Sequence, residues 1–373
     1  MELLIRTNPH PWLVIFHGQK LQKHTFFSIT ENRSYETSIP ELQNVIIRAY
    51  AHEWLVLEDI YSTDCCLWNP ISNDKIQLPP LPYSNRLECL LSAPPHDPQC
   101  RLLFLIHETP PPLYPYDDTY DESSCDHNDH ESPDDDADDE NPDDQTDDDD
   151  TDNENSDDNE NPHDDTRVNL RTLYLCKPGY SQEFHKQDLK SICEDNYLAE
   201  WTVFKGEFYA LKFQSNILVR LDVDDDSGTI TATPMTNKPP FDYSISKFQE
   251  MPRSRRYLIP SDDAQLLHVV ILYSGKDFED VHIILVFRFD FVKKVWDEVK
   301  SIGESAIFLE ETTSCFTRGT HLKRDSIYFM EGRYLYVFHM KTQSLSLTLP
   351  CPHVRNTEPY SYWLTLPCQY KES

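Results

Sequence analysis

The residues with the strongest chemical character form a dense acidic run. Residues 117–165 are 49 positions that contain 26 Asp or Glu and no Lys or Arg. Such a segment cannot bury apolar surface and its charges repel one another, so we expect it to be disordered. It would attract basic proteins such as histones and repel nucleic-acid phosphates. The densest acidic positions, taken as candidate partner-binding residues, are Asp134, Asp135, Asp136, Asp147, Asp148, Asp149 and Asp150. The alternative interpretation is a solvated surface insertion without a partner, since long loops cost little closure entropy.

A small basic patch is the second candidate binding site. Arg253, Arg255 and Arg256 lie in a segment that we interpret as an exposed loop. Guanidinium groups bind carboxylates and phosphates in bidentate fashion, so the patch is suited to an acidic or phosphorylated partner. A solvated loop with no partner is the alternative.

Other groupings give no catalytic, metal or cofactor site. Asp222-Val-Asp-Asp-Asp-Ser-Gly resembles a calcium loop, but Ser227 replaces the required Gly and Thr233 the required Glu, which favours a hairpin turn capped by Gly228. His127 and His130 lie in the acidic run without supporting ligands. We find no nucleotide, serine-hydrolase or metalloprotease motif, and therefore predict a non-enzymatic protein.

The remaining histidines and the cysteines fit a structural role. His268 and His282 fall in β segments, where we expect rim or hydrogen-bonded core positions. The ten Cys form no C-x-x-C pair, and no secretory signal or long apolar span is present. These features favour reduced thiols, no membrane association and a cytoplasmic or nuclear location.

Short strands recur in sets along the chain. One set is Trp54-Leu-Val-Leu-Glu, then Cys65-Cys-Leu-Trp, then Lys75-Ile-Gln-Leu-Pro; the sets end near residues 40, 79, 188, 233, 300 and 350. Without the acidic run their spacing is about 50 residues, near the period of a propeller blade. Short helical turns are expected only at 181–189 and 40–44.

Alternating strands need cover on both faces of each sheet, and radial stacking provides it. We therefore predict an all-β propeller of about six four-stranded blades. A lone strand near Tyr360–Leu366 should join the first blade and close the ring. The expected organisation is propeller at 1–116, a disordered acidic insertion at 117–165 within the third blade, and propeller again at 166–373. Two β-sandwiches are the alternative.

The repeats resemble the KIB-type β-propeller domain of plant F-box proteins. The resemblance rests on Ala51-His-Glu-Trp-Leu-Val-Leu-Glu, Leu67-Trp-Asn-Pro-Ile-Ser, Trp296-Asp-Glu-Val-Lys-Ser-Ile-Gly and Asp325-Ser-Ile-Tyr-Phe, spread over about residues 10–366. Glu53 stands where the family commonly has Gly, which predicts a less tight turn. Only ten residues precede Pro11-Trp-Leu, so no F-box is expected here.

The resemblance implies a module that holds a protein target for ubiquitin ligation. The target is unknown, docking to the ligase adaptor is doubtful without an F-box, and we expect a monomer with no cofactor and no nucleic acid. Two other functions stay open. One is an acidic-tract binder of basic proteins; the other is an enzyme with a site in the central channel, although the inner-strand candidates read as mainly apolar.

Overall fold

The computed structural model describes thirteen ranges of the chain: 11–62, 64–82, 87–108, 170–193, 197–212, 215–224, 227–240, 253–261, 265–274, 281–310, 313–318, 322–350 and 360–365. The chain separates into one unit of Met1–Thr109 with Asn169–Ser373 and a second unit of Pro110–Val168. All described strands belong to the first unit. The acidic run lies outside the described residues, so its expected disorder stays a prediction.

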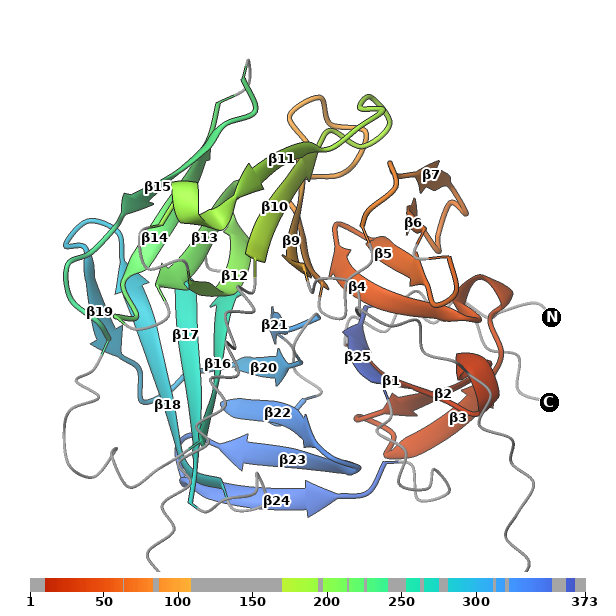
Figure 1. The fold of residues 1–373 in the computed structure, drawn as a ribbon. Coiled ribbons are helices and arrows are strands. Elements are labelled where there is room, and N and C mark those ends of the chain that lie inside the picture. The colour runs from red at the N-terminus through yellow and green to blue at the C-terminus, as the bar shows by residue number, and fades with distance from the viewer. Residues whose placement is uncertain are drawn as a thin grey trace, which may run out of the picture. The chain divides into compact units, whose positions relative to one another are not determined.

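The first unit is a six-bladed β-propeller (Figure 1). Its strands form six sheets, each continuous in sequence except the first, which confirms the predicted all-β fold and the number of blades. Within the ranges given above, the helical part consists of single 3-10 turns at Gln19–Leu21, Pro40–Leu42 and Leu189–Ser191. In the part of the chain that the structure describes, no helix is long and apolar enough to cross a membrane.

The blades are numbered here in chain order, each from its innermost strand outward. Blade 1 contains β25 (Tyr360–Leu364), β1 (Trp12–His17), β2 (Lys23–Ser28) and β3 (Arg33–Thr37). Blade 2 contains β4 (Val45–Ala51), β5 (Trp54–Asp59), β6 (Cys65–Trp68) and β7 (Lys75–Gln77). Blade 3 contains β8 (Leu87–Leu91), β9 (Leu102–Glu108), β10 (Leu170–Cys176) and β11 (His185–Asp188).

The second half of the ring follows the same scheme until its last blade. Blade 4 contains β12 (Leu198–Phe204), β13 (Glu207–Lys212), β14 (Leu218–Val223) and β15 (Ile230–Pro234). Blade 5 contains β16 (Arg253–Pro260), β17 (Leu266–Tyr273), β18 (Val281–Asp290) and β19 (Val295–Glu298). Blade 6 contains β21 (Cys315–Arg318), β20 (Ser305–Leu309), β22 (Ser326–Glu331), β23 (Tyr334–His339) and β24 (Ser344–Thr348).

Blade 6 departs from the predicted four strands. Its strand β20 pairs in parallel with β22 and antiparallel with β21, so that β21 becomes the innermost strand (Figure 1). The sequence of β20, Ser-Ala-Ile-Phe-Leu, is fully buried, which explains why it lies inside the sheet rather than at an edge. The expectation of four strands is therefore wrong for this blade alone.

The ring closes as predicted through the C-terminal strand. β25 pairs antiparallel with β1, with Trp363 opposite Leu13 and Tyr362 opposite Val14. This pairing joins the two ends of the propeller by main-chain hydrogen bonds within one sheet. The acidic run also emerges where expected, because β9 and β10 on either side of it are paired, with Glu108 opposite Leu170.

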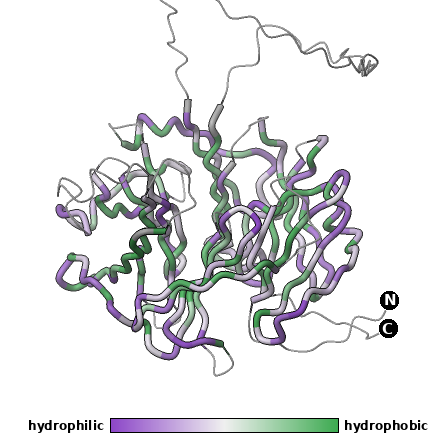
Figure 2. Tube along the Cα trace, turned by 90° about the horizontal axis from the view of Figure 1, so that it is seen from below, coloured by the Kyte–Doolittle hydropathy of each residue, from purple (hydrophilic) through white to green (hydrophobic). Residues whose placement is uncertain are grey.

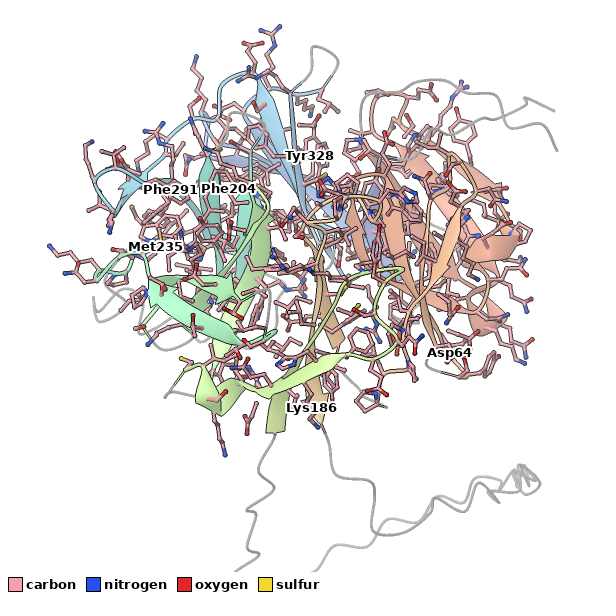
Figure 3. The ribbon with its side chains drawn as sticks, turned by 90° about the horizontal axis from the view of Figure 1, so that it is seen from above. Asp64, Lys186, Phe204, Met235, Phe291 and Tyr328 are labelled. Atoms are coloured by element: carbon pink, nitrogen blue, oxygen red, sulfur yellow. The ribbon has the colours of Figure 1, made fainter. Side chains whose placement is uncertain are left out.

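Apolar side chains between neighbouring blades hold the ring together. Six clusters of buried residues follow the ring, and each joins two adjacent blades. Between blades 4 and 5, for example, the rings of Phe204 and Phe291 stack at 5.1 Å, and Figure 3 shows them side by side. Figure 2 colours the chain by hydropathy: hydrophobic segments run through the body of the propeller, and hydrophilic segments lie at many of its outer turns.

Two local expectations are wrong. Residues 185–188 form the strand β11 instead of a helical turn, because they pair with Thr172–Leu175 of β10. The turn at Glu53 is tight: Ala51 pairs with Trp54, and both His52 and Glu53 have positive φ values of 53° and 67°. A two-residue hairpin of this kind requires positive φ at both positions, which glycine adopts at lower cost than glutamate.

Candidate functional site

Charged residues gather on the innermost strands, which contact one another around the middle of the ring. The strands β4, β8, β12, β16 and β21 follow each other in this way, and β25 contacts β4. The inner strands are mainly apolar, as expected, but they also carry Arg48, Glu88, Glu200, Arg255 and Arg256. These side chains are candidates for a central polar site.

Arg255 and Arg256 connect blade 5 to both of its neighbours. Consecutive residues of a strand point to opposite faces of the sheet, so the two side chains diverge. The Nε of Arg256 lies 3.2 Å from an oxygen of Glu200 on β12, and its Nη1 donates to Asn216 at 2.8 Å in blade 4. The Nη2 of Arg255 lies 3.1 Å from an oxygen of Glu331 in blade 6.

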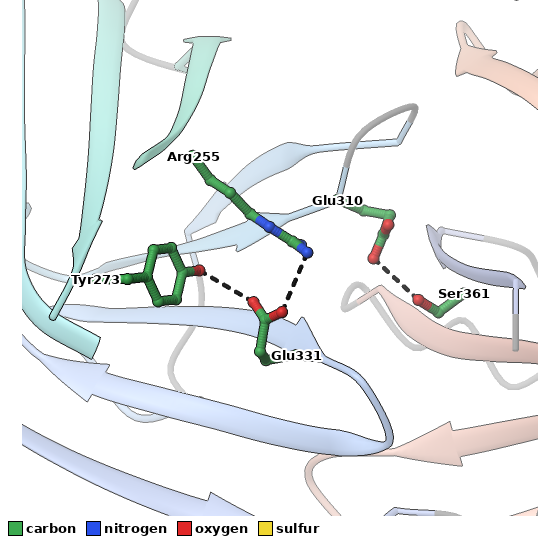
Figure 4. Close-up of polar contacts among 5 residues, drawn as sticks. All are labelled: Arg255, Tyr273, Glu310, Glu331 and Ser361. Atoms are coloured by element: carbon green, nitrogen blue, oxygen red, sulfur yellow. Dashed lines mark hydrogen bonds and ion pairs between the residues drawn. The ribbon is translucent and has the colours of Figure 1, made fainter. Parts of the chain in front are cut away.

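Glu331 is the centre of a cluster between blades 5 and 6, shown in Figure 4. One carboxylate oxygen accepts a hydrogen bond from Arg255, and the other accepts one from the Tyr273 hydroxyl at 3.0 Å. Burial and the nearby Glu331 charge raise the pKa of Tyr273. Burial alone would lower the pKa of Arg255, but the neighbouring Tyr257 and Glu331 outweigh it and raise that pKa. Arg255 therefore stays charged and Tyr273 stays protonated near neutral pH.

A second pair anchors the closing strand. The Ser361 hydroxyl on β25 donates to Glu310, which follows β20, at 2.9 Å (Figure 4). The main-chain N–H of Trp363 donates to Thr313 at 2.8 Å, and its indole N–H donates to the carbonyl of Leu309 at 3.1 Å. Blade 6 thus fixes β25 by side-chain bonds in addition to the pairing with β1.

Two β-bulges direct charged side chains of the inner strands. The register of β4 with β5 shifts between Ile47 and Ala49, at Arg48, and that of β12 with β13 shifts between Ala199 and Thr202, at Glu200. A bulge inserts an extra residue and re-aims its side chain. Arg48 forms an ion pair with Glu58 on β5, and both side chains are largely buried. A charged residue inside an otherwise apolar strand was the sequence signal for these pairs.

The structure corrects the location of the predicted basic patch. Arg253, Arg255 and Arg256 belong to the strand β16 and not to an exposed loop. Arg255 and Arg256 form ion pairs with Glu331 and Glu200 of the neighbouring blades. These pairs compensate the cost of partly burying the two guanidinium charges. The side chain of Arg253 lies outside the described residues.

The predicted acidic site also lies outside the described residues. The structure brings none of its members into a described contact. It comprises Asp134, Asp135, Asp136, Asp147, Asp148, Asp149 and Asp150. Partner binding by these residues and by the three arginines stays a prediction.

His268 and most of the described cysteines lie in the core. His268 is fully buried, and neither of its ring nitrogens has a hydrogen-bond partner in the described ranges, so the expectation of a hydrogen-bonded core histidine is wrong. Burial, with a smaller contribution from Arg256, lowers its pKa to about 3. Burial raises the pKa of Cys100 to about 11 and that of Cys176 to about 12, so both thiols are protonated at neutral pH.

The calcium-like segment is a hairpin turn, as predicted. Asp224 accepts bonds from both the N–H and the hydroxyl of Ser227 at 2.7 Å, and the N–H of Gly228 donates to the Asp224 carbonyl at 2.9 Å. Gly228 has a φ of +71°. The described ranges contain no group of three or more His, Cys, Asp or Glu placed to hold a metal ion.

Exposed apolar side chains are concentrated on one blade. Tyr334, Leu345 and Leu347 on the outer strands of blade 6 are 41%, 41% and 52% exposed. The other large exposed apolar residues of the described chain lie singly on turns or at a strand end: Tyr61, Ile71, Tyr180, Val292 and Tyr360. Scattered apolar residues are common on protein surfaces, whereas large contiguous apolar patches are typical of binding surfaces.

The fold defines the class of protein as a six-bladed propeller closed within its first blade. The family model described as KIB1-4 beta-propeller matches residues 26–130 and 161–348, and the chain belongs to this family. Comparison with curated proteins gives no match. Among solved structures, luciferin-regenerating enzyme is 10% identical with a TM-score of 0.30, covering 97% of this chain and 92% of that chain. A TM-score this low carries no argument about function.

Proposed function

We propose that this chain is a non-enzymatic protein-interaction module whose rigid propeller presents loops and outer strands to a protein target. One observation carries the proposal. Arg255 and Arg256 are engaged in ion pairs that fix blade 5 to blades 6 and 4, and Arg48 is engaged in a pair within blade 2, while the exposed apolar side chains lie at the periphery. Rigid scaffolds with binding groups on their loops are a common arrangement for recognition.

Membership of the KIB family extends the proposal to ubiquitin ligation. In this proposal, the propeller corresponds to the half of an F-box protein that recognises the target, in the cytoplasm or nucleus. Co-purification with the adaptor of a cullin–RING ligase tests this part. If the adaptor co-purifies with the chain, the chain belongs to a ligase. If a target co-purifies but the adaptor does not, only the target-binding part of the proposal is supported.

The proposal is tested by cross-linking the full chain in an extract of its source cells and mapping the cross-linked positions by mass spectrometry. We expect a target attached to the propeller. The matched control is Trp363→Ala, which removes the fully buried indole of the closing strand but leaves the acidic run intact. Once a lowered melting temperature shows that this variant is destabilised, a target that binds it equally well would contradict recognition by the propeller.

A second function is favoured by one observation, the acidic run at 117–165 with its 26 acidic residues. Such a polyanion can bind basic proteins such as histones through long-range attraction. Deletion of residues 117–165 should then abolish a histone interaction that weakens as salt rises. Unchanged histone recovery after the deletion would reject this function and leave the propeller proposal intact.

A further inference from the structure

The outermost strand of blade 6, β24, is an unprotected sheet edge. It ends the strand order of its sheet, and no described strand pairs with its outer side. All five of its residues, Ser344 to Thr348, are exposed, and none is charged or proline. An edge strand of this kind offers its free row of main-chain N–H and C=O groups to another strand.

The other outer strands are protected. Four of them carry charged side chains, which discourage pairing with another strand: β3 has Arg33 and Glu36, β7 has Lys75, β11 has Lys186 (Figure 3) and Asp188, and β19 has Asp297 and Glu298. The fifth, β15, is uncharged but ends in Pro234, and the Gln187 side chain of blade 3 bonds both main-chain groups of Ile230 at 2.9 and 2.7 Å. In the described chain, β24 has neither form of protection.

An apolar row lies along one face of this edge. The pairing of β23 with β24 places Leu347 opposite Tyr336 and Leu345 opposite Phe338, so these side chains share a face, together with Tyr334 two residues before Tyr336. The row continues the apolar core between blades 5 and 6, where Tyr336 stacks on Phe329 at 5.3 Å. The apolar row is therefore supported by packed side chains of the core.

We propose that an extended segment of another protein pairs with β24 as an additional strand. Large apolar side chains at alternate positions of that segment would lie over Leu345 and Leu347, because side chains on one face of a strand repeat every second residue. In this proposal Lys or Arg residues flank them, since the net charge of −32 of the chain, most of which is carried by residues 117–165, attracts a basic partner and repels a second copy of this chain. The inference rests on the proposed function, and specifies its surface and the chemistry of its target.

The probe is a fluorescein-labelled peptide, Lys-Lys-Val-Thr-Val-Thr-Val-Lys-Lys, titrated with the full chain and followed by fluorescence anisotropy. We expect saturable binding, weakened about tenfold by Leu345→Thr with Leu347→Thr, which keeps β propensity but removes the apolar row. The matched control is Ile71→Thr, at a residue that is 54% exposed on blade 2. Thermal melts check that each variant is folded.

Main-chain pairing is tested separately with two N-methylated peptides. One is methylated on alternate residues whose N–H groups point to one side, and the other on the remaining residues. Since only one side of the added strand faces β24, one peptide should lose binding and the other keep it. Equal behaviour of the two peptides, or equal binding of a peptide in which the three Val are adjacent, overturns the proposal.

Two further outcomes separate this inference from the proposed function. If the cross-linked target binds the Leu345→Thr, Leu347→Thr variant as well as the unchanged chain, the propeller is an interaction module but β24 is not its binding edge. If the unchanged chain is a dimer that this variant dissociates, the occupant is a second copy and the proposed partner is wrong. Loss of target and probe in the variant, with both retained by Ile71→Thr, supports the proposal.

Discussion

His268 is a buried histidine whose protonation should oppose folding as the pH falls. It is fully buried on β17, with ring centroids of Phe287 and Trp296 at 6.3 and 5.7 Å, and its ring nitrogens have no hydrogen-bond partner in the described ranges. The nearby charge is Arg256, which also disfavours a protonated ring. The folded protein therefore holds the imidazole in its neutral form.

The size of the effect follows from the two pKa values. The pKa in the unfolded chain is the ordinary 6.5, and in the folded protein it is about 3. Between these values the unfolded state binds more protons, so stability is complete above pH 6.5 and is lost as the pH falls toward 3. At pH 5, the loss from this residue is about 2 kcal/mol.

Replacement by an apolar ring tests this reasoning. His268→Phe removes the titrating group and its two unpaired nitrogens. When the pH is lowered from 7 to 5, the free energy of unfolding of the unchanged chain should therefore fall by about 2 kcal/mol more than that of the variant. Urea denaturation at both values measures the difference, with His268→Leu as a smaller replacement and His96→Gln, at an exposed histidine, as control. If the free energy of unfolding changes with pH by the same amount in the unchanged chain and in both His268 variants, the argument is refuted.

Two further predictions concern the ion pairs and the closing strand. Arg256→Met should lower the free energy of unfolding, measured by urea denaturation, by about 3 kcal/mol, because it leaves the Glu200 carboxylate buried without its charge partner. Lys300→Met removes an exposed pair with Glu298 and should lower the free energy of unfolding by less than about 1 kcal/mol. Similar losses in the two variants would contradict the role given to the inner pair. Trp363→Ala should cost about 3 to 5 kcal/mol, since the indole is fully buried and donates to Leu309. A melting temperature within about 2 °C of the unchanged chain would show that ring closure does not depend on this residue.

Local patterns in the sequence were sufficient to predict the repeat and its closure. Short alternating segments with turn residues between them indicate strands, and the recurring sets indicate blades. The unpaired strand at the C-terminus and the three-stranded set at the N-terminus together predicted the pairing of β25 with β1, which the structure confirms. Only blade 6 departs, because β20 pairs in parallel with β22, with Ala306 opposite Ser326, and the alternation of side chains does not show the direction of pairing.

The candidate site was less predictable. Alternation shows that Arg255 and Arg256 point to opposite faces, but it does not show which blade lies beyond each face. Glu331 is 76 residues from Arg255 in sequence, and the bulge at Glu200 changes the direction of a side chain without any fixed sequence signature. An exposed loop was therefore the wrong interpretation of this arginine-rich segment.

The sequence by itself determined the strand sets, the ring closure and the position of the acidic run in blade 3, because these depend on hydrophobic periodicity and turns within each segment. The tertiary structure alone decided which charges pair and that, among the described residues, His268 is buried without a hydrogen-bond partner and β24 is an unprotected edge. Burial, ion pairing and edge exposure depend on what neighbouring blades bring to the same place, and that information is shared among distant segments of the chain.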